Sequence, residues 1–311
     1  MIGRLRLWSG YALFFYVVTH LLNHALGLIS LRVLEAGRRW FVFVWHNPAG
    51  QTVLYGALLI HFSLALWSLY HRRALRLSHW EWLQWSLGIL VVPLGMIHVV
   101  GTRLAHEFYG VEAGYPWVLG SLLVGGWESI ARQFSLPLVV WLHACIGLHF
   151  AWRLKPWYRD ALPYLYAGAL LVPASGIAGA AIALRDVADL AQRPGFLEGL
   201  FDRVHAPTAA QVADLYMISY TLQGVALALL VAMFAVRPLR DLWERRAGVV
   251  RLDYGERKSV TQPAGFTILE MSRIAGIPHA SVCGGRGRCS TCRVRIGGAD
   301  RDKLPAAEPE E

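Results

Sequence analysis

Six long apolar stretches dominate this 311-residue chain, in which 55% of the residues are hydrophobic. Each stretch is long enough to cross the hydrocarbon core of a bilayer, which takes about 20 residues. The expected spans are residues 8–30, 50–70, 82–102, 135–154, 163–184 and 212–236. Backbone polar groups in lipid must be satisfied within their own segment, so each span is expected to be an α-helix. The sequence therefore predicts an all-α membrane protein with six transmembrane helices.

The distribution of basic residues predicts the orientation of these helices. With the N-terminus inside, the short inner connections His71–Leu77 and Arg153–Arg159 are basic, whereas the outer ones are longer and mixed. By the positive-inside rule, both termini are expected in the cytoplasm. These basic connections also explain the formal net charge of +9, so the charge gives no separate support to nucleic-acid binding.

Each of the first four spans contains a histidine, namely His20, His61, His98 and His143. Ionisable residues within a membrane are costly and mark functional sites. One straight helix cannot supply both axial ligands of a haem, so such sites are built from facing helices. At about 1.5 Å per residue, His20 and His98 lie roughly 18 and 24 Å from the inner ends of their helices. His61 and His143 lie roughly 16 and 12 Å from the outer ends of theirs. These depths favour one haem towards the outer side and a second nearer the middle or inner side.

Other interpretations of the polar residues remain open. His24 lies one turn after His20 and competes with it as a ligand, and His149 could replace His143 if that helix were rotated. All four histidines could instead be helix-packing residues. Three further side chains could bind a quinone or haem propionates, although anchoring and helix packing explain them equally well; these are Asn23, Arg103 and Arg153.

Several features outside the histidines bear on the fold. The aromatic stretch Trp40–Trp45 suits a membrane interface, and the long loop 103–134 is expected to hold a short interfacial helix. Pro93 predicts a kink before His98. The small-residue run Pro173–Ala181 in the fifth span allows close helix packing, either within one chain or between two. We therefore expect the first four spans to form a four-helix cofactor bundle, with the last two added to it.

The polar C-terminal part has the element order of a β-grasp domain. Two strands are expected over Val249–Tyr254 and Lys258–Gln262, and a later one over Arg293–Ile296. A helix over Ile268–Ala275 begins with the capping box of Thr267 and Glu270. The expected domains are residues 1–236 for the membrane part, 237–248 for a linker and 249–311 for a partial ferredoxin.

Three cysteines in this domain have the spacing C-x5-C-x2-C; they are Cys283, Cys289 and Cys292. Thiolates at such intervals suit an iron–sulfur cluster or zinc. We favour a [2Fe-2S] cluster, and a cytoplasmic location argues against disulfides. No cysteine follows Cys292, so the fourth ligand is missing from this sequence and the domain is expected to be incomplete.

The histidine segments resemble a known family. Val17-Val-Thr-His20, Ile60-His61-Phe, Gly95-Met-Ile-His98 and the segment starting at Leu142-His143 are similar to the dihaem cytochrome b anchor of succinate dehydrogenases and fumarate reductases. The resemblance implies two b-type haems, held by His20 with His98 and by His61 with His143, and contact with membrane quinone. The interval between Cys283 and Cys289 resembles that of adrenodoxin-like [2Fe-2S] ferredoxins.

A six-span anchor of this kind followed by a ferredoxin resembles the N-terminal part of bacterial membrane-anchored class III adenylate cyclases. That resemblance implies a redox- and quinone-sensing regulatory domain in the bacterial inner membrane. It also implies a homodimer and a downstream domain that converts ATP to cyclic AMP, so no catalytic residue is expected in this chain. The alternatives are a respiratory electron-transfer subunit acting on quinol or quinone, and a membrane scaffold without haem.

Overall fold

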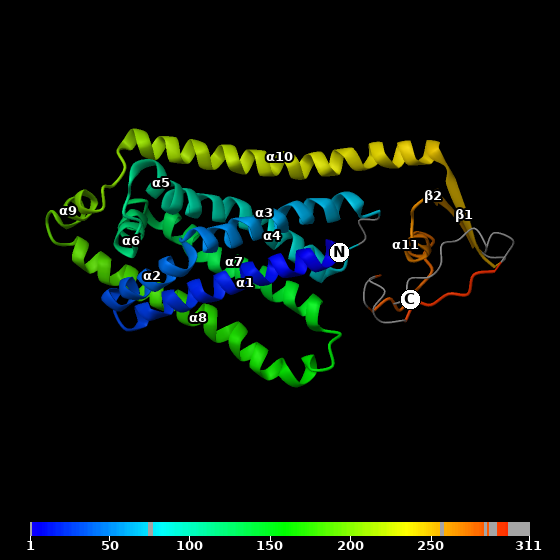
Figure 1. The fold of residues 1–311 in the computed structure, drawn as a ribbon, viewed down its shortest axis with the longest axis horizontal. Helices are drawn as coiled ribbons and strands as arrows, with labels where there is room; N and C mark the ends of the chain where they lie inside the picture. Colours follow the sequence, from blue (N-terminus) through cyan, green and yellow to red (C-terminus); the bar gives the residue numbers. More distant parts are fainter. Residues whose placement is uncertain (1, 74–76, 256–257, 283–284, 286–290, 298–311) are drawn as a thin grey trace. The chain divides into compact units, whose positions relative to one another are not determined.

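The computed structural model describes residues 2–73, 77–255, 258–282, 285 and 291–297. Within them, six helical segments are long and apolar enough to cross a membrane (Figure 1). They are Ile2–Leu28, Pro48–His71, His79–Tyr109, Gly126–Trp152, Tyr158–Ala191 and Ala209–Ala247. The six predicted spans are therefore confirmed, and the chain is a mostly helical, multi-pass membrane protein. The sixth helix extends well past the predicted apolar stretch.

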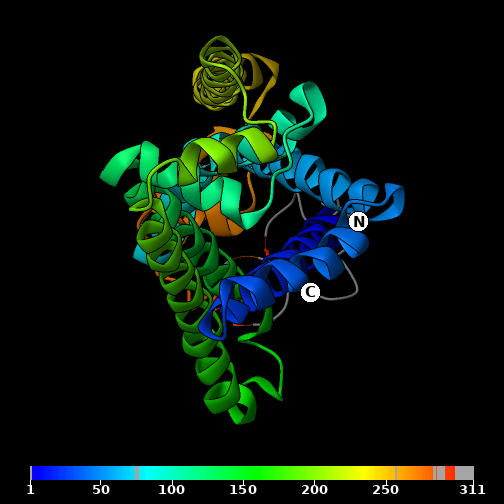
Figure 2. The same cartoon turned by 90° about the vertical axis from the view of Figure 1, so that its left-hand side faces the viewer.

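Long helices make up most of the first compact unit, and shorter ones connect them. The long helices are α1 (Ile2–Ala25), α3 (Pro48–His71), α4 (His79–Val99), α7 (Gly126–Trp152), α8 (Tyr158–Ala191) and α10 (Ala209–Ala247). The shorter elements are η1 (Leu26–Leu28), α2 (Leu31–Trp45), η2 (Val100–Leu104), α5 (Ala105–Tyr109), α6 (Tyr115–Val124) and α9 (Phe196–Arg203). Figure 2 shows α10 end on.

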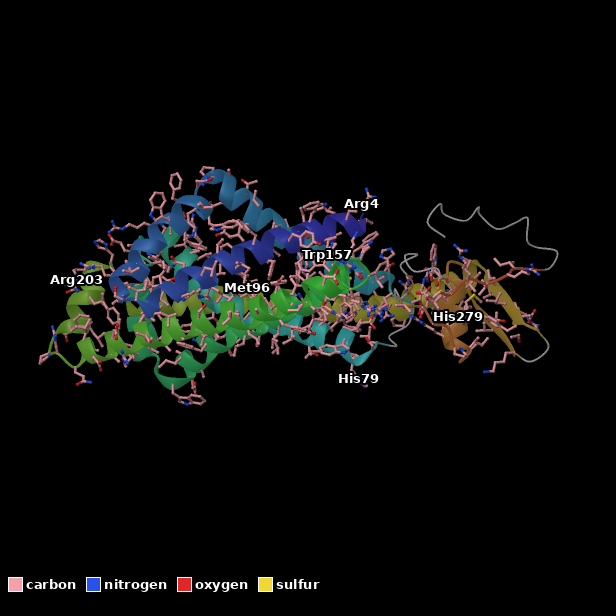
Figure 3. All side chains as sticks on the ribbon, turned by 90° about the horizontal axis from the view of Figure 1, so that it is seen from below. Arg4, His79, Met96, Trp157, Arg203 and His279 are labelled. Atoms are coloured by element: carbon pink, nitrogen blue, oxygen red, sulfur yellow. The ribbon has the colours of Figure 1, made fainter. Side chains whose placement is uncertain are left out.

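The long helices alternate in direction, as expected for successive membrane spans. Arg4, His79 and Trp157 lie at one end of the helical unit, and Arg203 lies at the other (Figure 3). Since these three residues stand at or near the starts of α1, α4 and α8, the three helices begin at the same end. We call it the Arg4 end.

Glycine contacts hold α1 and α8 together. Cβ atoms added at Gly27 or Gly179 would clash with the backbone of the other helical segment, and one at Gly176 would lie 2.8 Å from the carbonyl oxygen of Leu21. The small-residue run of the fifth span therefore packs within the chain. Accordingly, α8 is not an addition to the bundle but lies directly against α1, the helix that carries His20.

The connections opposite the Arg4 end are largely helical. The aromatic stretch Trp40–Trp45 lies in α2, which begins where the Ser30 hydroxyl accepts a hydrogen bond from the Val33 amide. The expected short helix in the 103–134 loop is α6. Its apolar side chains pack with those of α2 and α8 in a buried cluster formed by Leu34, Tyr115, Leu119, Leu122, Ala183 and Val187.

The second compact unit contains the C-terminal domain together with short segments at helix ends, Trp67–Arg76 and Leu154–Pro156. Strands β1 (Val249–Tyr254) and β2 (Lys258–Pro263) form an antiparallel pair. Helix α11 (Ile268–Ile274) follows, and both hydrogen bonds of its predicted capping box are present. The strand predicted over Arg293–Ile296 is not formed, because the segment pairs with neither described strand.

Candidate cofactor site

The four intramembrane histidines lie in two pairs, each joining two helices. The ring centres of His20 on α1 and His98 on α4 are 6.0 Å apart, with 63° between the ring planes. Those of His61 on α3 and His143 on α7 are 6.4 Å apart, at 84°. These are the pairs expected from helix depth. That they ligate haems remains a prediction.

Both separations fit two imidazoles on opposite sides of one metal ion. With metal–nitrogen bonds of about 2.0–2.1 Å, and roughly 1.1 Å from each nitrogen to its ring centre, the ring centres would lie about 6.3 Å apart. Among the described residues, no group of three or more His, Cys, Asp or Glu side chains is arranged to hold a metal ion. The arrangement therefore suits a group that needs two protein ligands, such as a haem, better than a zinc site.

Hydrogen bonds at Nδ1 orient the imidazole rings of His61 and His143. Nδ1 of His143 lies 3.0 Å from the carbonyl oxygen of Gln84, to which it can only donate. Nε2 of His143 is then left without a proton and is available to a metal, as is usual for ligating histidines. Nδ1 of His61 lies 3.4 Å from the Ser9 hydroxyl. Since Ser9 donates its own proton to the Arg6 carbonyl at 3.0 Å, His61 donates from Nδ1 and its Nε2 is left available.

Glycines make room for both rings of this pair. A Cβ atom added at Gly88 of α4 would lie 3.0 Å from Cε1 of His143, and one at Gly10 of α1 would lie 3.4 Å from Cε1 of His61. Each imidazole thus lies against the backbone of a neighbouring helix. An alanine at Gly88 would displace the His143 ring, whereas Gly10 leaves slightly more room.

The His20–His98 pair has a third histidine beside it. Nε2 of Gln133 donates to Nδ1 of His98 at 3.1 Å, which leaves the proton of a neutral His98 ring on Nε2. Nε2 of His20 lies 3.1 Å from Nε2 of His24. In the described part of the chain, Nδ1 of both His20 and His24 is buried without a hydrogen-bond partner. The ring of His24 also packs edge-on against Tyr115. Because His24 lies within hydrogen-bond distance of His20, it remains an alternate ligand.

The second alternate is placed differently. His149 lies near the end of α7, where its Nδ1 is 2.7 Å from the Tyr158 hydroxyl and its ring packs against Phe150. His149 therefore contacts Tyr158 and Phe150 at the end of α7, whereas His143 lies beside His61. This placement favours His143 over His149 as a ligand.

The two pairs lie at different depths along the same helices. His61 contacts α1 at Gly10, ten residues before His20, and His143 contacts α4 at Gly88, ten residues before His98. At about 1.5 Å per residue, both helices separate the pairs by roughly 15 Å. Because α1 and α4 start at the same end, the His61–His143 pair lies nearer the Arg4 end.

Polar groups surround the His20–His98 end of the bundle. Directly after His98, the chain forms one π-helical turn, η2, an irregularity often found at functional sites. Arg103 in this turn donates to Nδ1 of His46 at 3.2 Å and forms an ion pair with Glu107. Burial and then the charge of Arg103 lower the pKa of His46. Arg103 is thus held by protein groups, and its contacts do not decide between anchoring and cofactor binding.

The two other candidate polar partners are also engaged by the protein. Asn23 donates to the Tyr115 hydroxyl at 2.6 Å. This contact joins α1 to α6, and burial raises the pKa of Tyr115. The guanidinium of Arg153 lies 5.3 Å from the ring centre of Phe150. Helix packing, one of the two explanations that the sequence allowed, therefore accounts for the buried position of Asn23.

Sequence reasoning missed the residues that orient the rings. Gly10, Gly88 and the carbonyl of Gln84 became apparent only from the structure, although glycines within apolar spans are a signal of close approach. A backbone carbonyl carries no signal of its own in the sequence. Ser9 and Gln133 are polar residues in apolar segments, so their spacing from the histidines could have identified them.

The cysteine segment lies only partly within the described residues. Cys283 and Cys289 fall outside them, and Cys292 is a free thiol. The amide of Val282 donates to the Thr291 hydroxyl at 3.3 Å. This contact brings together the neighbours of Cys283 and Cys292.

Comparisons with known proteins bear on this segment. Residues 252–311 match the family described as the 2Fe-2S iron-sulfur cluster binding domain. The chain is also similar to the F subunit of the Na(+)-translocating NADH-quinone reductase from Yersinia pestis (strain Pestoides F), with 36% identity over 89 residues. Its counterpart from Yersinia enterocolitica serotype O:8 / biotype 1B (strain NCTC 13174 / 8081) is 37% identical over 91 residues. Each match covers 29% of this chain and 21% of the relative.

The similarity therefore spans about a fifth of the length of these relatives. No solved structure matches the chain. Together, the family match and the relatives support a [2Fe-2S] cluster in the C-terminal segment and a redox, electron-transfer role.

Proposed function

We propose that this protein is a transmembrane redox relay that holds two b-type haems and passes their redox state to a C-terminal [2Fe-2S] domain. The observation that carries the proposal is the pairing of four intramembrane histidines at ring-centre separations of 6.0 and 6.4 Å. In the proposal, His20 and His98 hold one haem and His61 and His143 the other. When bound, the haems supply one-electron redox chemistry.

A backbone hydrogen bond fixes which nitrogen of His143 would face a metal. The carbonyl of Gln84 holds His143 with its proton on Nδ1, whereas metal binding by Nε2 of His98 requires the Gln133 amide to turn its oxygen towards Nδ1. In the C-terminal domain, three thiolates would supply cluster ligands, those of Cys283, Cys289 and Cys292. The family match over residues 252–311 supports this assignment.

A direct test is cofactor analysis of the purified full chain. A pyridine haemochrome assay and a reduced-minus-oxidised spectrum should show two b-type haems per chain. A fully folded protein without haem absorbance would contradict the proposal and leave the membrane scaffold. Electron paramagnetic resonance of the reduced protein tests the [2Fe-2S] cluster separately.

We further propose that the relay is the quinone-sensing input of a class III adenylate cyclase whose catalytic domain lies outside this chain. This proposal rests on the resemblance of the histidine and cysteine segments, and it includes cytoplasmic termini, a bacterial inner membrane and a homodimer. Since Gly176 and Gly179 pack against α1, a dimer would use a different surface. Changes of cyclic AMP with the redox state of the quinone pool, in cells carrying the full-length gene, would test it.

The second candidate is a respiratory electron-transfer subunit. The similarity to one component of an NADH-quinone reductase favours it, because that similarity falls on a quinone-linked electron-transfer protein. Purified full-length protein that reduces a soluble acceptor with quinol, without any cyclic AMP response, would support the respiratory role over the sensor.

A further inference from the structure

Two buried arginines of α10 lie at the end of α3. Both belong to the second compact unit, which includes Trp67–Arg76 as well as the chain from Val231 onwards. Arg237 is 7% exposed and Arg240 is 9% exposed. Arginine is rarely buried to this degree unless it is paired, so these two side chains call for a structural or functional reason.

Both arginines bind backbone carbonyls where α3 ends. Nη2 of Arg237 donates to the carbonyl of Arg72 at 2.5 Å and to that of Arg73 at 3.4 Å. Nη1 of Arg240 donates to the carbonyl of Tyr70. The last carbonyls of a helix lack partners within it, and positive charge is favourable at this end of the helix dipole. Arg240 therefore caps the last turn of α3, and Arg237 holds the two residues that follow the helix.

Aromatic and acidic side chains complete the attachment. The guanidinium of Arg240 lies 5.0 Å from the ring centre of Tyr70, and its Nη2 lies 2.9 Å from Oδ1 of Asp241. Glu244, one turn after Arg240, forms an ion pair with Arg73. We call Arg237, Arg240, Glu244 and Arg73 the α3 clamp.

The clamp also reaches the C-terminal domain. The guanidinium of Arg73 lies 5.1 Å from the ring centre of Phe266, in the turn between β2 and α11. At the neighbouring Gly265, φ is +96° and an added Cβ would lie 2.9 Å from Nη2 of Arg73. Arg73 thus contacts both the end of α10 and the domain that follows it.

We propose that Arg237 and Arg240 are positioning residues that couple the helix bearing His61 to the cluster-binding domain. Tyr70 lies nine residues after His61 on α3, about 14 Å along one continuous helix. A shift of α3 at His61 therefore moves the carbonyls that the two arginines hold, and α10 leads directly into β1. The inference rests on the proposed function, in which His61 is a haem ligand.

The test uses Arg237→Gln, Arg240→Gln and the double variant of the full chain in nanodiscs. The matched control is Arg245→Gln, on the same helix, whose exposed guanidinium donates to Gln262 instead. Hydrogen exchange of the last turn of α3 should be at least about tenfold faster in the double variant, because the cap is lost. Arg240→Lys, which keeps the charge and one donor, should restore part of the protection.

A second readout separates coupling from local stability. In the wild type, exchange in the β2–α11 turn should differ between the oxidised and reduced protein, and this difference should be lost in the double variant. The proposal is overturned if the wild type shows no such difference, if the double variant retains it, or if α3 exchanges as in Arg245→Gln. Haem content, measured on the same samples, tests the proposed function independently.

Discussion

At the scale of single residues, the groups beside each histidine determine which ring nitrogen is available to bind a metal. His143 donates from Nδ1 to the Gln84 carbonyl, and this bond requires Gly88 because a Cβ there would meet the ring. His20 has no such partner at Nδ1 and faces a second histidine, His24. His143 is thus set apart from its alternate His149, whereas His20 and His24 lie side by side, and substitution at His20 and His24 distinguishes them.

Replacing His20 should remove one of the two proposed haems. In His20→Ala, the remaining partner His98 cannot hold a six-coordinate low-spin haem alone, so haem per chain should fall from about two to about one. His24→Ala is the matched variant and should retain both haems. Loss of haem in His24→Ala with retention in His20→Ala, measured by the haemochrome assay, would transfer the ligand role to His24.

His46 should make the folded protein sensitive to acid. Burial and Arg103 lower its pKa in the folded state below the ordinary value of about 6.5. Below that value the unfolded chain binds the proton and the folded chain does not, so this contribution to stability is present at higher pH and is lost as the pH falls. The fall in thermal midpoint from pH 7.5 to 5.5 should be smaller in His46→Gln than in the wild type.

A suitable control for this effect is His79→Gln, because His79 is exposed at the start of α4. Its acid sensitivity should equal that of the wild type. An equal fall in thermal midpoint for His46→Gln and His79→Gln would show that His46 does not cause the acid sensitivity.

At the scale of helices, close contacts decide which elements form the bundle. α8 carries no haem-ligand candidate, yet its glycines lie against the part of α1 that contains His24. Helix association in lipid depends on such small residues, because apolar burial alone gives no driving force there. The contact between α1 and α8 thus supports the position of the His20–His98 pair.

Enlarging this contact should destabilise the bundle. In Gly179→Ala the new methyl group would clash with the backbone at His24, an overpacking that typically costs about 1–3 kcal/mol. Gly168→Ala on the same helix is the control, because no atom of the described residues lies within 4 Å of the added Cβ. The thermal midpoint should fall in Gly179→Ala and not in Gly168→Ala. Equal midpoints would show that the contact is not tight.

At the scale of the whole molecule, two histidine pairs share one set of helices at two depths. Ten residues of both α1 and α4 separate them, or roughly 15 Å. Groups this far apart and without shared partners usually respond independently to substitution. The two sites should therefore be separable by mutation.

His61→Ala and His98→Ala should each remove about one haem, and the double variant should remove both. The haem left in each single variant should keep its own redox midpoint, because its ligands and their partners are unchanged. Titrations that show one variant losing both haems, or a large change in the remaining midpoint, would indicate that the two sites form one cooperative unit.

Much of the fold followed from local patterns. The six spans follow from apolar length, and α11 follows from the capping box of Thr267 and Glu270. The aromatic stretch Trp40–Trp45 was expected only as an interfacial segment and is part of helix α2, because Ser30 caps a helix that begins at Leu31. The strand expected at Arg293–Ile296 depended on a partner strand, and strand pairing is not encoded in the segment itself.

The sequence by itself determined that this is a six-span helical membrane protein with at least one histidine in each of four spans and a ferredoxin-type cysteine motif. Lipid allows little besides helices at such lengths, so composition alone was sufficient for that conclusion. Only the tertiary structure decided which rings face each other, that α8 packs on α1, and that two arginines of α10 bind carbonyls at and just after the end of α3. Those facts depend on how each helix is rotated about its axis and on how closely the backbones of sequence-distant helices approach one another.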